Sequence, residues 1–167
     1  ELYQTAFSKK KNKINYIFEA SSHSLDQNRF KKFPVNIAVL TNISQDHLDY
    51  HKKFINYKKA KLKLFTKHLK TDGHAIINDK IKGINIFKKK IIKNQKLITY
   101  GTNLSNVNVS IDYKKTIIKI YNKIFSVKLI DLTQIELENL ACAIACCIGL
   151  NIKINKILKV FNKITNP

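Results

Sequence analysis

The sequence predicts an α/β fold, in which a mostly parallel sheet is flanked by helices and carries a small antiparallel section. Segments typical of strands alternate with a segment typical of a helix between residues 15 and 100. The run 35–41 is almost entirely apolar, as in strands that a parallel sheet buries on both faces. Residues 107–130 alternate between apolar and polar in short runs, which favours an antiparallel meander. The length of 167 residues suits one domain.

The first hundred residues contain the elements of the parallel section. In chain order they are a short helix at 2–10, strands at 15–20 and 35–41, a helix at about 52–70, and strands at 74–78 and 96–100. Asp72 and Gly73 are expected to form a turn before the strand at 74–78, and Gly101 is expected to close the strand at 96–100.

Two helices are expected near the end of the sequence. Thr133 and Glu136 have the spacing of a capping box, so a helix is expected to begin there. Its apolar residues recur at helical spacing up to Gly149, which is its predicted C-terminal stop. A last helix is expected at about 153–164, with an apolar stripe along one face.

The net charge of +20 comes from 31 Lys and Arg against 11 Asp and Glu, and Arg29 is the only arginine. Lys, Ile and Asn together make up 74 of the 167 residues, and all three have AT-rich codons. We therefore interpret the charge as a codon bias. Nucleic-acid readers favour arginine forks and cluster their cations, whereas these lysines are spread along the chain. A basic nucleic-acid-binding domain is kept as an alternative.

The cysteines and the hydropathy indicate a cytoplasmic chain. Cys142, Cys146 and Cys147 are odd in number and include no C-x-x-C pair, which favours a reducing compartment. We expect them to pack within a helix. No stretch of about 18 apolar residues and no signal peptide is present, so no membrane contact is expected.

Two polar segments follow the first two predicted strands and form the candidate site, because ligands of α/β sheets bind beyond the carboxyl ends of the strands. The candidate residues of the first segment are Glu19, Ser21, Ser22, His23, Asp26, Gln27 and Arg29, and those of the second are Asp46, His47, Asp49 and His51. The second set could coordinate a metal or could be helix caps and surface polar residues. Arg29 would suit a carboxylate or a phosphate. A serine hydrolase is disfavoured because no G-x-S-x-G elbow occurs.

Lys61 occupies an unusual place in the predicted helix at 52–70. At 100° per residue, its neighbours within about 60° are Phe54, Tyr57, Leu64, Phe65 and His68. Lys59 and Lys63 point the opposite way, as solvated lysines should. Lys61 therefore either extends its amine to the surface or to a carboxylate, or is a buried and reactive amine.

Residues 19–29, 41–51 and 57–65 together resemble the Mur ligase family, and most closely its UDP-N-acetylmuramoyl-tripeptide synthetases (MurE type). Residues 19–29 (EASSHSLDQNR) resemble the family's E-[AV]-S-S-H-x-L-x-Q-x-R segment. Residues 41–51 (TNISQDHLDYH) resemble T-N-[IL]-[ST]-x-D-H-L-D-Y-H, and residues 57–65 (YKKAKLKLF) resemble Y-x-x-A-K-x-x-L-F. Residues 139–145 (NLACAIA) resemble the N-x-x-A-A-I-A helix. The similarity runs from about residue 14 to 150.

The resemblance implies a P-loop NTPase-like fold and an ATP-dependent amide ligase of peptidoglycan synthesis. ATP would phosphorylate the D-Glu carboxylate of UDP-MurNAc-L-Ala-D-Glu, and the amine of a diamino acid would attack the acyl phosphate. Meso-diaminopimelate is favoured over L-lysine. The resemblance also implies a cytoplasmic enzyme that is a monomer at full length and has no specific nucleic-acid partner.

The resemblance also assigns roles to residues. Lys61 matches a carbamylated lysine, and it would hold Mg²⁺ together with Glu19 and His47. Ser21, Gln27 and Arg29 match positions that bind the sugar-nucleotide dipeptide. Asn78 and Asp79 match a shortened N-x-D-D segment near the adenine.

The sequence departs from the family in lacking a G-x-x-G-K-[ST] phosphate loop. We therefore interpret residues 1–167 as a partial central ATP-binding domain without its phosphate-loop segment and without the C-terminal domain, incomplete in its N-terminal part and inactive alone. Another Mur-like ligase, such as one similar to folylpolyglutamate synthetases, and a non-enzymatic remnant are kept as alternatives.

Overall fold

The computed structural model describes residues 16–30, 33–44, 47–91, 95–112, 115–128 and 132–161. Within these residues, six strands form one sheet in the order β1-β2-β3-β4-β5-β6. The strands are β1 Val35–Leu40, β2 Leu69–Asn78, β3 Lys96–Tyr100, β4 Val107–Asp112, β5 Lys115–Ile120 and β6 Lys123–Lys128. The first four pair in parallel and the last three are antiparallel. The predicted fold class is thus confirmed.

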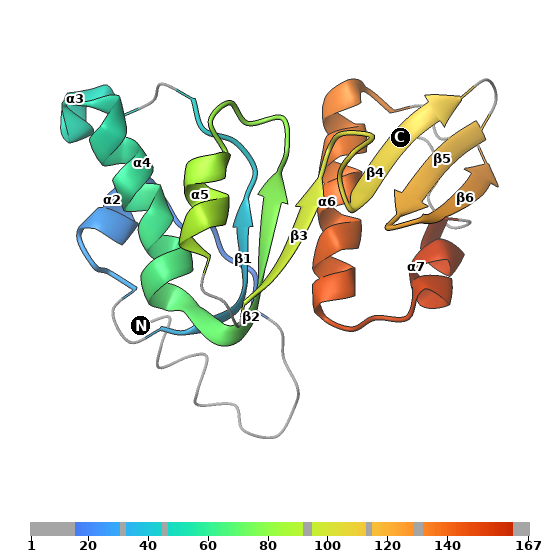
Figure 1. Ribbon diagram of the computed structural model, residues 1–167, viewed down its shortest axis with the longest axis horizontal. Coiled ribbons are helices and arrows are strands. Elements are labelled where there is room, and N and C mark those ends of the chain that lie inside the picture. Colours follow the sequence, from blue (N-terminus) through green and yellow to red (C-terminus); the bar gives the residue numbers. More distant parts are fainter. Residues whose placement is uncertain are drawn as a thin grey trace.

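Helices cover both faces of this sheet. They are α2 Ser22–Asp26, α3 Leu48–His51, α4 Phe54–Lys63, the π-helix η1 Leu64–His68, α5 Asn85–Lys90, α6 Gln134–Gly149 and α7 Ile154–Phe161. Figure 1 shows α2, α3, α4 and α5 gathered near β1 and β2, whereas α6 and α7 lie beside the antiparallel strands. The helix predicted at about 52–70 is therefore found as α4 and η1.

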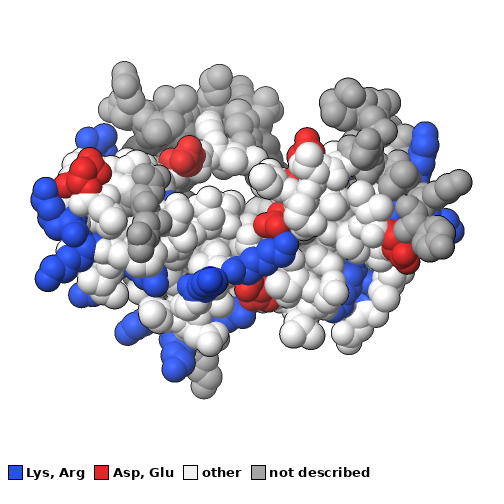
Figure 2. Space-filling view, turned by 90° about the horizontal axis from the view of Figure 1, so that it is seen from above, with Lys and Arg blue, Asp and Glu red and all other residues white. Residues whose placement is uncertain are grey.

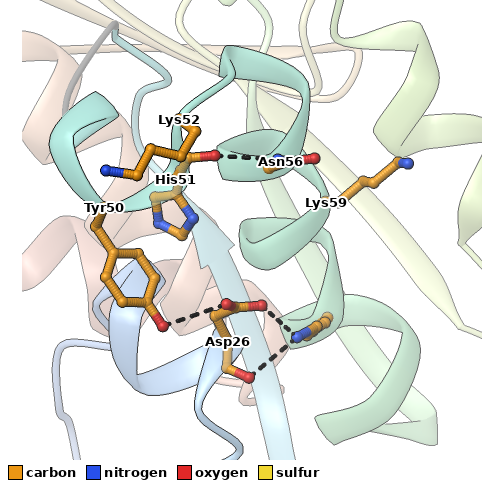
Figure 3. Close-up of a pocket in the computed structure, with 7 residues that line it drawn as sticks. Asp26, Tyr50, His51, Lys52, Asn56 and Lys59 are labelled. Carbon is orange, nitrogen blue, oxygen red and sulfur yellow. Dashed lines mark hydrogen bonds and ion pairs between the residues drawn. The ribbon is translucent and has the colours of Figure 1, made fainter.

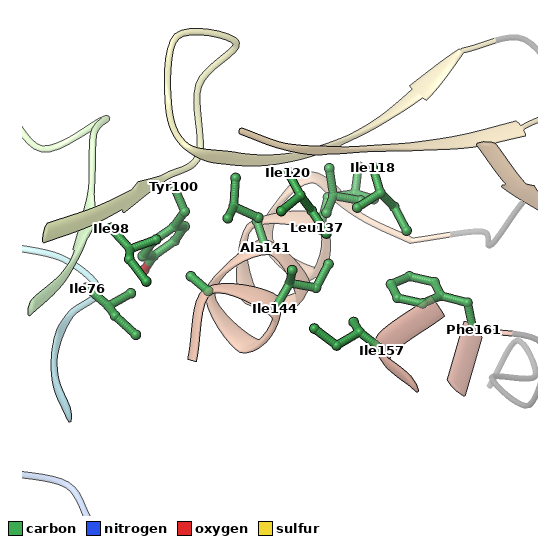
Figure 4. Packing of buried hydrophobic residues seen from close by; sticks show 13 residues of the cluster. Ile76, Ile98, Tyr100, Ile118, Ile120, Leu137, Ala141, Ile144, Ile157 and Phe161 are labelled. Carbon is green, nitrogen blue, oxygen red and sulfur yellow. The ribbon is translucent and has the colours of Figure 1, made fainter. Parts of the chain in front are cut away.

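Two hydrophobic clusters stabilise the fold, one on each face of the sheet. The first joins β2 to β5 with α6 and α7, and Figure 4 shows Ile144 of α6 and Phe161 of α7 within it. The second joins β1 and β2 with η1 and α5, through residues such as Phe65 and Phe87. Successive side chains of a strand point to opposite faces. Ile76 therefore enters the first cluster, and Ile77 enters the second.

The capping box at the start of α6 is present as predicted. The Thr133 backbone N–H donates to Glu136 Oε2 at 2.8 Å, and the Glu136 N–H donates to Thr133 Oγ1 at 3.3 Å. α6 ends at Gly149 as predicted, but the left-handed residue beyond it is Asn151, with a φ of 58°. A Cβ on Gly149 would lie 3.2 Å from Ile37 Cδ1, so this glycine instead allows α6 to approach the sheet.

The three cysteines pack within α6, as predicted. All are free thiols of intermediate exposure, and they contact the first hydrophobic cluster. The last predicted helix begins at Ile154 and is described to Phe161. The helix expected at 2–10 lies outside the described residues.

The strand predicted at 15–20 is wrong over its described part, because residues 16–20 belong to no strand. The apolar side chain of Phe18 is used differently. Its ring stacks on Phe30 at a centroid distance of 5.3 Å and meets Phe33 edge-on at 5.2 Å. Aromatic packing of a loop thus satisfies the pattern that suggested a strand.

The turn predicted at Asp72 and Gly73 is also wrong, because β2 runs through both residues. Gly73 is buried, and a Cβ there would lie 2.6 Å from Leu69 Cδ1 and 2.9 Å from the Asn36 carbonyl oxygen. The register of β1 against β2 shifts between Val35 and Ile37. Glycine at this position therefore serves a close approach inside an irregular strand pair.

Candidate functional site

The two polar segments meet beside α4, as the sequence predicts for a site built from both. Ser21 caps α2, because its Oγ accepts the Ser24 backbone N–H at 3.1 Å. His23, in the first turn of α2, places its ring 4.7 Å from the ring of His47 and 4.3 Å from that of Tyr50. His47 precedes α3, which follows the carboxyl end of β1. The second segment thus lies where predicted, whereas residues 16–20, the described residues just before the first segment, form no strand.

His51 lies inside the junction of the two segments. Its Nε2 forms a hydrogen bond of 2.9 Å with Ser22 Oγ. Burial lowers the pKa of His51, and the nearby Asp26 carboxylate opposes this shift only in part. The imidazole is therefore predominantly neutral at neutral pH and can both donate and accept.

Asp26 anchors the end of α2 to α4. Lys63 Nζ lies 2.6 Å from Asp26 Oδ1, and the Tyr50 hydroxyl donates to Asp26 Oδ2 at 3.3 Å. The hydrogen bond from Lys63 holds the pKa of Asp26 below its usual range. The prediction that Lys63 points away as a solvated lysine is thus wrong, because α2 packs against that side of α4.

An open hollow of about 530 Å³ lies between these elements (Figure 3). Its lining consists of Asp26, Tyr50, His51, Lys52, Asn56, Lys59 and Lys63. Lysines outnumber carboxylates in this lining, so the hollow favours an anionic ligand over a cationic one.

Lys61 is half-buried on α4, between buried neighbours on the predicted apolar stripe. Its Nζ lies 5.7 Å from the centre of the Tyr57 ring, and Tyr57 is only 2% exposed. The amine thus lies against an aromatic face on the inner side of the helix. Lys59, on the same helix, is exposed as predicted.

Five of the candidate site residues have exposed side chains. They are Glu19, Gln27, Arg29, His47 and Asp49. The chain reverses at Asn28, with a φ of 54°, and the Arg29 backbone N–H donates to the Ser24 carbonyl oxygen at 2.9 Å. The turn after α2 therefore places Gln27 and Arg29 on the same exposed bend, where a ligand can reach both.

Asn78 and Asp79 lie at the carboxyl end of β2 and are held by internal hydrogen bonds. Asn78 Nδ2 donates to the Thr41 carbonyl oxygen at 3.1 Å. Asp79 accepts from Lys88 Nζ at 2.7 Å and from Ser105 Oγ at 2.8 Å. Burial alone would raise the pKa of Asp79, but these hydrogen bonds outweigh it and hold the pKa below its usual range. Direct contact of either residue with a nucleotide stays a prediction.

The described residues contain no group of three or more His, Cys, Asp or Glu side chains placed to hold a metal ion. Asp46 lies outside the described residues. Unmodified Lys61 is a cation and no ligand, whereas a carbamate on its Nζ would present oxygens of the kind that Mg²⁺ prefers. The donor atoms of Glu19, His47 and Lys61 suit magnesium only when Lys61 carries that carbamate, and the role of these three residues as a metal site stays a prediction.

Charge and hydropathy add two findings. Figure 2 shows Lys and Arg spread over this face of the described molecule, with Asp and Glu among them. On this face, the cations therefore form no focused patch of the kind that nucleic-acid readers present. Among the helices that the structure describes, none has the length and apolar character needed to cross a membrane.

The sheet, its carboxyl-end loops and the sequence segments that form them define a family. The chain belongs to the Mur ligases, because residues 1–147 match the family model described as the Mur ligase middle domain.

Named relatives make this likeness more specific. The UDP-N-acetylmuramoyl-L-alanyl-D-glutamate--2,6-diaminopimelate ligase of Rickettsia bellii is 52% identical over 95 residues, covering 56% of this chain and 20% of the relative. The enzyme of the same name from Rickettsia typhi is 36% identical over 157 residues, covering 90% of this chain and 32% of that enzyme.

Solved structures agree with these relatives. A ligase of the same name has a TM-score of 0.73 at 27% identity, covering 89% of this chain and 32% of that one. A MurF ligase from Thermotoga maritima in complex with ADP has a TM-score of 0.63 at 15% identity, covering 89% of this chain and 34% of that ligase. The chain therefore covers about a fifth to a third of the length of these four proteins.

Proposed function

We propose that this chain is part of an ATP-dependent amide ligase that joins 2,6-diaminopimelate to UDP-MurNAc-L-Ala-D-Glu in the cytoplasm. The substrates are those in the names of the relatives, which are 36% and 52% identical to the chain. The observation that carries the proposal is the contact between His23 and His47, with ring centres 4.7 Å apart. It joins the two segments in which the residues expected to bind sugar nucleotide and metal are found.

In the proposed mechanism, the chain's own residues bind and orient the reactants. Arg29 and Gln27, on the bend after α2, would hold anionic or amide groups of the sugar-nucleotide dipeptide. Glu19, His47 and carbamylated Lys61 would hold Mg²⁺, which neutralises charge on the transferring phosphoryl group when it is bound. Positioning and charge neutralisation are the main contributions a protein makes to phosphoryl transfer.

The test uses the longest natural polypeptide that contains this sequence. It is incubated with UDP-MurNAc-L-Ala-D-Glu, ATP, Mg²⁺ and isotope-labelled meso-diaminopimelate, and L-lysine replaces the diamino acid in a parallel reaction. Labelled sugar-nucleotide tripeptide and ADP in equal amounts are expected only with diaminopimelate. ATP consumption without transfer of label to the sugar nucleotide would overturn the proposal.

Two lysines of α4 provide a matched pair of variants. Lys61→Ala is expected to lower the ligation rate by about a hundredfold or more, because the set of magnesium ligands becomes incomplete. Lys58→Ala removes a second half-buried lysine of the same helix, whose Nζ lies 4.5 Å from the centre of the Phe54 ring, and it is expected to change the rate by less than about threefold. Equal effects of the two substitutions would contradict the role of Lys61.

A further inference from the structure

A buried hydrogen bond joins the two polar segments. Ser22 and His51 are 29 residues apart in the sequence, and their Oγ and Nε2 atoms lie 2.9 Å from each other. Ser22 is 1% exposed and His51 is 5% exposed. In a buried setting, losing one partner leaves the other unsatisfied, which costs more than the bond itself contributes.

The bond lies next to residues that the proposed function uses on both sides. Ser22 stands between Ser21, which caps α2, and His23, whose ring faces that of His47. His51 is the last residue of α3, and His47 immediately precedes that helix. Fixing Ser22 against His51 therefore fixes the substrate-side segment against the metal-side segment.

The His51 imidazole also connects to Lys61, the third of the residues expected to hold magnesium. The rings of His51 and Tyr57 are 5.6 Å apart, and the Lys61 amine lies 5.7 Å from the same Tyr57 ring. A contiguous set of packed groups thus runs from Ser22 through His51 and Tyr57 to Lys61.

α3 depends on such contacts for its position. It has only four residues, and the residues on either side have positive φ angles, 55° at His47 and 61° at Lys52. A helix this short has no stability of its own in water. Besides the bond to Ser22, two hydrogen bonds hold α3. The Tyr50 hydroxyl donates to Asp26 Oδ2, and Asn56 Nδ2 donates to the His51 carbonyl oxygen.

We propose that Ser22 and His51 are positioning residues, which hold Ser21, His47 and Lys61 in the arrangement that binds the sugar nucleotide and the metal. This inference rests on the proposed function. It assigns neither residue a contact with substrate, so the effect of losing the bond reaches the reaction through their neighbours. Misplacing reacting groups by about 1 Å costs on the order of a hundredfold in rate.

The experiment compares four variants of the full-length polypeptide. Ser22→Ala removes the bond, and Ser22→Cys keeps a side chain of the same shape, slightly larger, with a weaker hydrogen-bonding group. His51→Gln retains an N–H at the distance of Nε2. His68→Gln is the control, because His68 is a second buried histidine, 7% exposed, on η1.

For Ser22→Ala we expect kcat/KM for the sugar nucleotide to fall by about tenfold or more, and the Mg²⁺ concentration for half-maximal rate to rise by a similar factor. The KM for ATP is expected to change by less than about twofold. Ser22→Cys and His51→Gln should retain most of the activity. His68→Gln should lower thermal stability alone. Equal losses in His68→Gln, or no loss in Ser22→Ala, would overturn the inference.

A second measurement separates this inference from the proposed function. Trypsin cuts after Lys13 and Arg29, so His23 is the only histidine in the peptide 14–29. Deuterium exchange at the C2 position of its ring, read by mass spectrometry, should speed up in Ser22→Ala and stay unchanged in His68→Gln. Unchanged exchange would overturn the inference. A wild-type protein without ligase activity would refute the proposed function, but it would leave the positioning of His23 by the Ser22–His51 bond to be decided by the exchange measurement.

Discussion

Gly101 offers a sharp test of how the carboxyl ends of β2 and β3 are held together. Its φ is 104°, and an added Cβ would lie 2.8 Å from Asn78 Oδ1. That backbone conformation costs alanine about 1–3 kcal/mol. Displacing Asn78 weakens its hydrogen bonds to the Lys80 N–H and the Thr41 carbonyl oxygen, each worth about 1 kcal/mol. We therefore expect Gly101→Ala to destabilise the fold by about 3–5 kcal/mol.

Gly83 is the matched control for Gly101→Ala. Its φ is 74°, but the nearest atom to an added Cβ is the flexible Lys58 Nζ at 3.9 Å. Gly83→Ala should therefore cost only the backbone strain of about 1–2 kcal/mol. The assay is urea unfolding followed by circular dichroism. In an Asn78→Ala background the cost of Gly101→Ala should fall to that of Gly83→Ala. Equal costs for both glycines in the wild-type background would refute this reasoning.

Three further predictions concern titration, thiol reactivity and capping. Burial lowers the pKa of His68, so the unfolded chain binds its proton first and stability falls as the pH drops below about 6.5. The urea concentration at the midpoint of unfolding should decrease over this pH range, and it should decrease less in the His68→Leu variant. Hydrogen bonds from Cys146 and Tyr100 lower the pKa of Cys142 to about 7, whereas burial raises that of Cys147. Iodoacetamide at neutral pH should therefore modify Cys142 first; mass spectrometry showing the reverse order would contradict this. Thr133→Ala should lower the melting temperature by about 2–4 °C, because the capping box is lost; an unchanged temperature would show that it contributes little.

Local patterns predicted the elements whose structure is decided locally. The apolar run of β1 and the alternation in β4 to β6 mark strands within a few residues, and the Thr133–Glu136 spacing sets a local helix cap. The predictions failed where a distant partner decides. Residues 16–20 have the composition of a strand, yet Phe18 packs on Phe30 and Phe33. Asp72 and Gly73 have turn chemistry, but contact with β1 keeps them in a strand.

The candidate site shows the same division. Helical periodicity correctly placed Lys61 on the inner side of α4 and Lys59 outside. It could not show that Asp26 reaches Lys63, since that ion pair depends on where α2 packs. Ser22 and His51 were both among the candidate residues, but their bond joins segments 29 residues apart. No pattern within a few residues predicts that they pair, although two buried polar side chains in adjoining segments require hydrogen-bond partners.

β2 has a consequence for how this protein can change over evolutionary time. Ile76 and Ile77 are joined by one peptide bond and are both fully buried, but they belong to separate hydrophobic clusters. A smaller side chain at Ile76 calls for larger ones within the first cluster, and a smaller side chain at Ile77 calls for larger ones within the second. The side that carries the candidate site can therefore be repacked gradually while the antiparallel side keeps its sequence.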